Sequence, residues 1–413
     1  MDKSSIFNPR ISHTILLLST CFLILFSCQQ EKKGTNEGRT TQTLTISDGG
    51  IKTLTLEDGG NFEGLTALKL ATIDDKEYIT FYDYKTHSIY MYDYVTNDLF
   101  KKISMEKDGP NAVKNASKFF FQSIDSIFVD GSFGMYLINS KAEVFTKKSK
   151  GAKLHNGMPL VTSDSKFYRF HPDSRFKNGH IEMVISQMRG DNKNNEYAIF
   201  NFKKDSIIKE FVQSEEIINN FEEIQKVQEE ANKRRESAYA INRFFASNKN
   251  HLYSSNSISD SLFLFKEGKL AKTIYAGVPT IAVANYSDYS TLQIIERYER
   301  GSRAFENPKQ PPHYKSMLLS PDGRFIYRVL HHGTKPKLIE GEERPIPAPL
   351  GATLIVLNTE TEALNYYDLP VGEIDLPLYF ENSLFVSNDG IYFRVKDQQN
   401  EDQVQFRFFK VTK

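Results

Sequence analysis

Two groups of histidines have the residue types that could bind a metal ion. His331 and His332 are adjacent, and His171, Asp173 and His180 lie close together between two apolar segments. Adjacent residues of a β-strand point to opposite faces of the sheet, so His331 and His332 together make a poor metal site. The second group lies in a turn-rich stretch, which is typical of polar side chains in a surface loop. We therefore predict no metal site and no cofactor.

Catalytic motifs are missing from the sequence. It contains no G-x-S-x-G nucleophile elbow, no H-E-x-x-H zinc motif, no P-loop and no pair of C-x-x-C motifs. The 52 acidic residues could supply two carboxylates for glycoside hydrolysis, but their spacing does not show which of them converge. The sequence therefore assigns no catalytic residue.

Cys28 has a more specific chemical context than any other residue of the chain. Lys3 and Arg10 precede an apolar run over residues 15–26. That run is too short to span a bilayer and is typical of a secretory signal. Residues 25–28, LFSC, resemble the lipobox of bacterial lipoproteins, in which the cysteine thiol takes a diacylglycerol and the chain is cut before it. The resemblance implies that Cys28 is lipidated.

One position departs from the lipobox pattern. Phe26 stands where a small residue is usual, and the alternatives are a plain secretory signal that is cut elsewhere or an N-terminal helix that stays in place. Cys21 would be removed with the signal, so the mature chain would contain one cysteine and no disulfide. Gln29 is not the aspartate that retains some lipoproteins in the inner membrane. We therefore expect a cell-envelope protein anchored in the outer membrane.

The chain divides into three predicted parts. Residues 1–27 form a lipoprotein signal peptide, residues 28–43 the lipidated cysteine and a flexible tether, and residues 44–413 a single domain. Residues 29–43 contain no apolar side chain, which favours a flexible segment. The net charge is zero, with 52 basic and 52 acidic residues. This balance excludes a polycation built for nucleic acid, so we expect membrane contact through the lipid.

The domain is predicted to be all-β. Apolar and polar residues alternate from Leu44 onward between short turn segments, and 31 Phe and 21 Tyr suit pleated strands. This pattern favours a β-propeller of six four-stranded blades, with a β-sandwich pair or an irregular β-protein as the alternative, and it assigns the aromatic surplus to blade cores. Residues 43–56 have the pattern of a hairpin around Asp48, and they could pair with the last blade to close the ring. The predicted blades span residues 62–105, 117–147, 157–212, 238–275, 312–368 and 376–411.

A weak internal repeat supports the propeller. Residues 320–329, SPDGRFIYRV, are similar to residues 387–395, SNDGIYFRV, and looser copies begin at Ser163 and Ser247. Asp and Asn satisfy backbone groups in turns, and Gly tolerates positive φ. The repeat therefore predicts the middle hairpin of a four-stranded blade.

Three segments interrupt the β-pattern, and one of them, residues 279–300, could be helix or strand. Residues 214–236 are predicted to form an inserted helix, with Ser214 as N-cap and Ile217, Phe221 and Ile224 on one face. Such a helix would pack on the propeller rim or, alternatively, bind a partner. Residues 331–351 contain four prolines and three glycines, which predicts an extended loop between two strands of the fifth blade.

The chain resembles a family of bacterial envelope propellers. The residues that carry this are LFSCQQ at the start, ITFYDYKTHSIYMYDYVTNDLFKKI followed by DGPN at 108–111, and the later LLSPDGRFIYRV and ATLIVLNTETEALNYYDLP. They are similar to those of the six-bladed lipoproteins of Bacteroidetes in the family named domain of unknown function 4221. The resemblance covers most of residues 40–413. It implies a propeller in the envelope, and it assigns no residue beyond Cys28.

Two classes of function are compatible with these features. The first is a non-enzymatic, lipid-anchored module that binds a protein or a small molecule and not nucleic acid. The alternative is a propeller enzyme that acts on glycans or peptides at the mouth of the axial channel, an analogy that rests on the fold alone. A weaker possibility is a sensor that acts through residues 331–351.

Overall fold

The structure is a computed structural model of the full chain, which divides into two units, Met1–Thr41 and Gln42–Lys413. All of the residues that it describes lie in the second unit, and no helix among them could cross a membrane. The described residues are 44–56, 65–131, 134–148, 154–155, 158–159, 166–170, 176–177, 180–187, 195–201, 206–212, 243–248, 251–267, 269–283, 312–338, 346–376, 383–396, 398, 400 and 402–412.

The strands form six larger antiparallel sheets, which we number as blades 1 to 6 in chain order. Blade 1 contains β2 (Leu65–Ile73), β3 (Lys76–Asp83), β4 (Ser88–Asp93) and β5 (Leu99–Ser104). Blade 2 contains β6 (Lys118–Ser123), β7 (Ser126–Gly131), β8 (Gly134–Ile138) and β9 (Val144–Lys148). Blade 3 contains β12 (Lys166–Phe170), β14 (His180–Gln187), β15 (Asn195–Asn201) and β16 (Ser206–Val212), with β13 (Phe176–Lys177) paired to β14.

Blades 4 to 6 follow the same plan. Blade 4 contains β17 (Arg243–Ser247), β18 (Leu252–Asn256), β19 (Ser261–Lys266) and β20 (Lys269–Tyr275). Blade 5 contains β21 (His313–Leu319), β22 (Phe325–His331), β25 (Ala352–Asn358) and β26 (Leu364–Asp368). Blade 6 contains β27 (Leu384–Ser387), β28 (Gly390–Arg394), β29 (Gln403–Thr412) and β1 (Thr45–Thr55). Two short pairs are β10 (Leu154–His155) with β11 (Met158–Pro159), and β23 (Thr334–Lys337) with β24 (Ile346–Pro349).

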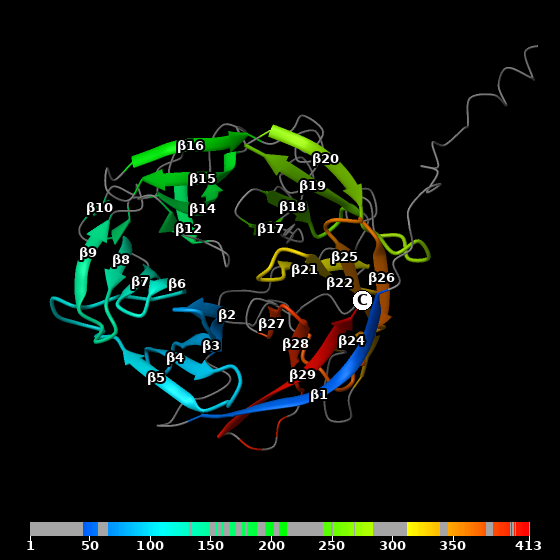
Figure 1. Ribbon diagram of the computed structural model, residues 1–413, viewed down its shortest axis with the longest axis horizontal. Helices are drawn as coiled ribbons and strands as arrows, with labels where there is room; N and C mark the ends of the chain where they lie inside the picture. The colour runs from blue at the N-terminus through cyan, green and yellow to red at the C-terminus, as the bar shows by residue number, and fades with distance from the viewer. Residues whose placement is uncertain are drawn as a thin grey trace, which may run out of the picture. The chain divides into compact units, whose positions relative to one another are not determined.

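The blades lie around a common centre, with the first strand of each blade innermost (Figure 1). This arrangement confirms the predicted all-β propeller, and the described part of the chain contains strands and turns without a helix. Five of the predicted blades are four-stranded sheets, and the sheet in the region of the third has a main path of four strands plus the short β13. Each predicted range contains the chain-consecutive strands of one blade to within one residue, while β1 of blade 6 lies outside its range and the fifth range also contains the separate pair β23 and β24.

β1 closes the ring, as Figure 1 shows where the N-terminal strand lies along the C-terminal one. It pairs with β29 from Thr45 opposite Thr412 to Thr55 opposite Gln403. The predicted hairpin around Asp48 is therefore wrong. The segment is one strand with a bulge between Asp48 and Ile51, where Gly50 adopts a φ of 91° and its N–H donates to Asp48 Oδ1 (3.0 Å). The turn-forming residues make a bulge because a long-range partner is available on β29.

The core lies between neighbouring blades, where the faces of adjacent sheets pack against each other. Separate apolar clusters join blades 1 and 2, blades 4 and 5, blades 5 and 6, and blades 6 and 1. Aromatic rings stack across strands in these layers. The Phe81 and Tyr90 centroids are 5.2 Å apart, and the Phe385 and Tyr392 centroids are 4.5 Å apart. The aromatic surplus thus belongs to blade cores, as predicted.

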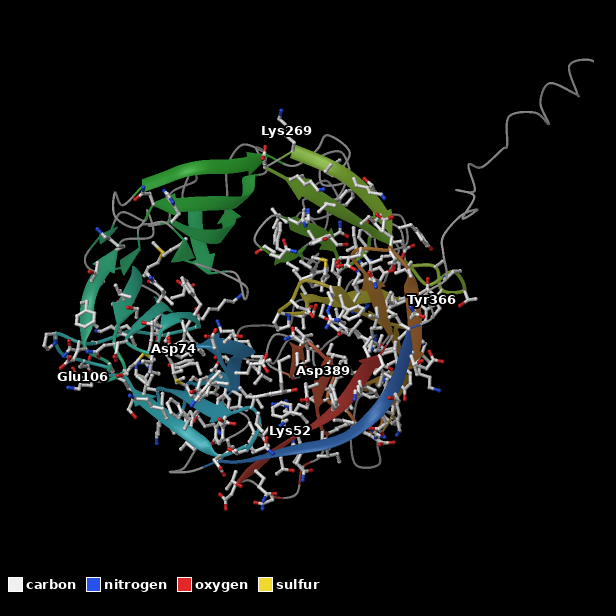
Figure 2. The ribbon with its side chains drawn as sticks, viewed as in Figure 1. Lys52, Asp74, Glu106, Lys269, Tyr366 and Asp389 are labelled. Carbon is white, nitrogen blue, oxygen red and sulfur yellow. The ribbon has the colours of Figure 1, made fainter. Side chains whose placement is uncertain are left out.

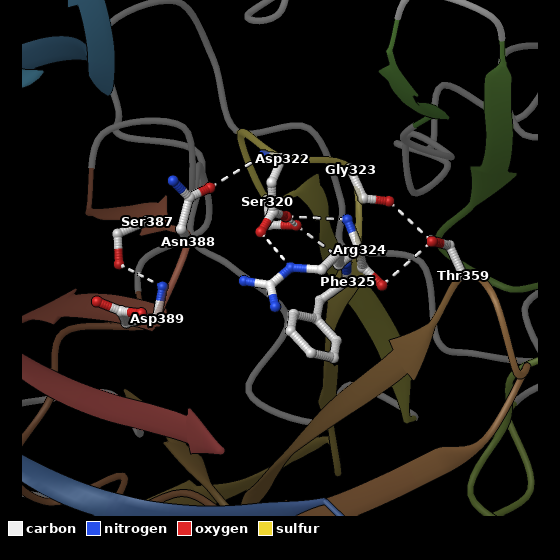
Figure 3. A network of polar contacts seen from close by, with 9 residues as sticks. All are labelled: Ser320, Asp322, Gly323, Arg324, Phe325, Thr359, Ser387, Asn388 and Asp389. Carbon is white, nitrogen blue, oxygen red and sulfur yellow. Dashed lines mark hydrogen bonds and ion pairs between the residues drawn. The ribbon is translucent and has the colours of Figure 1, made fainter. Parts of the chain in front are cut away.

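The repeated Ser-x-Asp-Gly segments form the first hairpin of blades 5 and 6, between the two innermost strands (Figure 3). The prediction of a middle hairpin was wrong by one strand. Asp322 Oδ1 accepts from the Arg324 N–H (2.9 Å), and the Asp322 N–H donates to Asn388 Oδ1 of blade 6 (2.9 Å). The looser copy at Ser247 also joins the first two strands of a blade, whereas the copy at Ser163 precedes β12, the first strand of blade 3.

Several predictions concern residues outside the described part of the chain. These are the lipidated Cys28, the helix at 214–236, and His171 and Asp173. Of the predicted loop 331–351, His331 is the last residue of β22 and residues 332–351 lie between β22 and β25 of blade 5, and the structure corrects the description of this segment. They contain the strand pair β23 and β24 in place of an irregular loop.

Candidate functional site

The two sides of the ring carry connections of different length. Because successive strands are antiparallel, the first-to-second and third-to-fourth connections of each blade lie on one side, which we call the turn side. On the other side, the loop side, lie the second-to-third connections and those that join one blade to the next. The five longest gaps between consecutive blade strands span residues 149–165, 213–242, 276–312, 332–351 and 369–383, and the described strand ends that flank them all lie on the loop side.

The turn side is closed by local hydrogen bonds. In blade 5, Thr359 Oγ1 donates to the Gly323 and Arg324 carbonyl groups at 2.8 and 3.1 Å, which ties the two turns of the blade together (Figure 3). In blade 2, the Ser140 hydroxyl donates in the same way to Asp125. These polar groups are satisfied within the turns, so we interpret them as structural.

Arg328 of β22 is a fully buried cation on the loop-side half of the boundary between blades 4 and 5. Its guanidinium donates to the Ala276 carbonyl (3.0 Å), the Ser255 hydroxyl (3.0 Å) and the Ser259 carbonyl (2.8 Å). It also stacks on the ring of Tyr314, with Cζ 3.6 Å from the centroid. Burial lowers the pKa of Arg328 from its ordinary value. Arg328 thereby holds two loop-side connections of blade 4 against blade 5.

Asp260 is the carboxylate of this network. The Tyr314 hydroxyl donates to Asp260 Oδ1, and burial raises the pKa of Tyr314. The Asp260 carbonyl accepts from the Ala276 N–H (2.8 Å), so both the main chain and the side chain of Asp260 are held in place. Asp260 itself is only partly buried. The network therefore connects a buried cation to a carboxylate that reaches the surface.

Two further tyrosines approach the same point at Gly277. The Tyr366 hydroxyl donates to the Gly277 carbonyl (3.1 Å), and Figure 2 places Tyr366 at the outer rim of blade 5. A methyl group on Gly277 would lie 2.6 Å from the Asp260 carboxyl carbon and 2.7 Å from the Tyr275 hydroxyl, so a larger residue would displace these side chains. Tyr275 is 49% exposed and Tyr366 41% exposed. We call Asp260, Tyr275, Gly277, Tyr314, Arg328 and Tyr366 the Asp260 cluster.

The histidines noted in the sequence make separate contacts. His331 is buried beside His313, with ring centroids 5.3 Å apart, and its Nδ1 accepts from the Gly333 N–H (3.2 Å). Burial and neighbouring positive groups lower the pKa of His331 to about 3. His332 Nε2 lies 2.8 Å from Thr353 Oγ1, and His180 Nε2 lies 3.2 Å from Asn201 Nδ2. Among the described residues, no three His, Cys, Asp or Glu side chains are grouped so as to hold a metal ion.

Sequence reasoning missed the Asp260 cluster. Its one visible sign is Arg328, which interrupts the otherwise apolar strand FIYRVLH and was interpreted only as part of the repeat. Asp260, Gly277 and Tyr366 carry no local pattern, because they meet across the boundary between two blades.

Comparison with known proteins identifies the family. The family model described as domain of unknown function, DUF4221, matches residues 42–328. The chain belongs to the DUF4221 family. The resemblance noted in the sequence is thereby confirmed.

One solved structure supports the fold. A DUF4221 member from Bacteroides vulgatus is 15% identical, with a TM-score of 0.63, over 89% of this chain and 98% of that one. A Bacteroides fragilis protein whose name describes it as exported has a TM-score of 0.47 and 10% identity, over 91% of this chain and 98% of that one. No curated protein matches the chain. At these identities the DUF4221 member shows the propeller and assigns no ligand.

Proposed function

We propose that this DUF4221 protein is an outer-membrane lipoprotein, acylated at Cys28, whose propeller binds a protein or small-molecule partner through the loop side. The observation that carries the binding role is that the five longest connections all begin and end at described strand ends on one side of the ring. Loops held on a rigid scaffold are where proteins place binding residues, and connections of this length are uncommon without a function.

Two features support a rigid scaffold beneath those loops. The apolar clusters run between neighbouring blades, and β1 closes the ring through β29. On the turn side, by contrast, the hydroxyl groups of Ser140 and Thr359 form hydrogen bonds between turns of their own blades. A partner that approaches the loop side therefore meets connections of varied sequence on a fixed frame.

The anchor is tested by acylation of the full chain in its native host. We expect metabolic labelling with a palmitate analogue to mark the wild type and a Cys21→Ala control, and to miss Cys28→Ala. Sedimentation of membranes should retain the first two proteins and release the third, or leave it as uncleaved precursor. Labelled Cys28→Ala protein would contradict the anchor.

The binding side is tested by photo-crosslinking from two exposed apolar positions. Leu350, 55% exposed, lies on the loop side beside β24, and Val95, 82% exposed, lies in the turn after β4 on the turn side. A photoreactive amino acid at Leu350 should form a discrete crosslinked species in the envelope, and the same probe at Val95 should not. Equal crosslinking from both positions, or from Val95 alone, would contradict a loop-side partner.

A further inference from the structure

We infer that the Asp260 cluster is a binding site for a neutral, hydroxyl-rich ligand of the saccharide class. This inference deepens the proposed function, because the cluster lies at the start of the loop-side connection 276–312. It is argued from three properties of the cluster: a fixed carboxylate, a balanced charge and two half-exposed aromatic rings.

The carboxylate is positioned in advance. Tyr314 holds the side chain of Asp260, and the Ala276 N–H holds its carbonyl. Arg328, behind them, fixes Ala276 and Ser259, which are neighbours of the cluster along the chain. A hydrogen-bond acceptor that is already ordered loses little conformational entropy when a ligand binds. Burying Arg328 costs free energy. We interpret the preorganised acceptor at the surface as the function that this buried cation supports.

The local charge favours an uncharged ligand. The positive charge of Arg328 offsets the negative charge of Asp260. The next ion pair at this blade boundary, between Lys272 and Glu362, is balanced as well. An ammonium group or an anion would gain little electrostatic free energy at a carboxylate whose charge is already compensated. A hydroxyl group can donate to the carboxylate without bringing a charge.

The tyrosines supply the remaining surface. Tyr275 and Tyr366 are each about half exposed, and the hydroxyl of each is near Gly277. Their rings can contact the C–H face of a sugar, while hydroxyls and the carboxylate can bond its rim. A few fixed polar groups among aromatic rings are the usual make-up of a small-molecule site.

The inference is tested by titrating the mature full-length protein with a panel of methyl glycosides and linear oligosaccharides, with spermidine as the cationic probe. We expect at least one saccharide to bind, and Tyr275→Ala and Tyr366→Ala each to weaken it about tenfold or more. Both substitutions leave Arg328 and its partners intact, so folding should be preserved. Tyr84→Ala is the matched control, because Tyr84 is 53% exposed in a loop-side turn of blade 1.

The outcomes separate this inference from the proposed function. Binding of spermidine in place of saccharides, binding unaffected by both tyrosine variants, or equal loss in Tyr84→Ala would overturn the site. Absence of saccharide binding would overturn it as well, while a crosslink from Leu350 would still support a loop-side partner. Absence of both the crosslink from Leu350 and saccharide binding would contradict the proposed function as well.

Discussion

At the scale of single residues, Arg328 stands out as a fully buried charge, which needs hydrogen-bond partners to be stable in the interior. It lies in the middle of an apolar strand, and its guanidinium satisfies two buried carbonyl groups and a serine hydroxyl. Removing it leaves these acceptors and Asp260 without their cation. We expect Arg328→Ala to lower the free energy of unfolding by about 3–5 kcal/mol.

The measurement is urea unfolding followed by circular dichroism. Arg324→Ala is the matched control, because Arg324 pairs with Asp322 in the exposed turn that precedes the same strand, and its loss should cost about 0–1 kcal/mol. Equal losses in the two variants would mean that the buried network does not join blades 4 and 5.

His331 makes stability depend on pH. Its pKa is about 3 in the folded protein, because burial disfavours the charged ring, against about 6.5 in an unfolded chain. Between these values the unfolded chain binds a proton that the folded chain does not. This contribution to stability is therefore fully present above the unfolded pKa and is lost as pH falls from about 6.5 towards 3.

The variant His331→Asn isolates this effect. An asparagine carbonyl can replace Nδ1 as acceptor for the Gly333 N–H, and it does not titrate. Thermal unfolding at a series of pH values should show a loss for the wild type on the order of 2–4 kcal/mol by about pH 4, with a flatter profile for His331→Asn. Parallel profiles would exclude His331 as the source.

At the scale of elements, β1 shows what local sequence can and cannot reveal. Asp48, Gly49 and Gly50 have the chemistry of a tight turn, and the structure uses it for a bulge. The choice between hairpin and bulge depends on β29, more than 350 positions away in the chain. By contrast, the strands of blades 1 and 2 are contiguous in the chain, and the predicted ranges 62–105 and 117–147 enclose them to within one residue.

β1 is also the element whose loss should open the ring. It pairs with β29, Leu54 is fully buried between blades 6 and 1, and the Tyr92 hydroxyl of blade 1 donates to the Thr55 carbonyl (2.8 Å). A chain that begins at residue 57 exposes the edge of β29 and the apolar face beside it.

We expect that truncation to lower the melting temperature by several degrees or more and to speed amide exchange in β28 and β29. A chain that begins at residue 44, which lacks the predicted tether and keeps β1, is the control and should match the wild type. Unchanged exchange in β29 after loss of β1 would show that closure by this strand is dispensable.

At the scale of the whole molecule, the ring determines which residues meet. The predicted blade ranges matched the sheets because alternation and turns are properties of contiguous sequence. The Asp260 cluster gathers residues from β20, β21, β22 and β26, and it exists only once blades 4 and 5 pack face to face. Spacing in the sequence does not predict that contact. In the structure, the fully buried charge of Arg328 identifies the position of the cluster.

The pair β23 and β24 lies outside the six blades, so it can be tested separately from them. Within the described chain these two strands pair with each other. Two hydrogen bonds join the segments that connect the pair to blade 5. His332 N–H donates to the Gly351 carbonyl (2.9 Å), and Leu350 N–H donates to the Gly333 carbonyl (3.0 Å). Replacing residues 335–348 with Asn-Gly keeps both bonds and the buried Thr334. The frame should therefore be unaffected.

We expect this shortened protein to melt within a few degrees of the wild type, because surface changes away from the core alter stability by about 0.5 kcal/mol. Leu354→Ala in β25 is the contrasting variant. Leu354 is fully buried between blades 5 and 6, so its truncation should cost about 2–5 kcal/mol. If the shortened protein melts as early as Leu354→Ala, the β23–β24 pair is part of the frame. If it melts like the wild type and loses the crosslink from Leu350, the pair belongs to the binding surface.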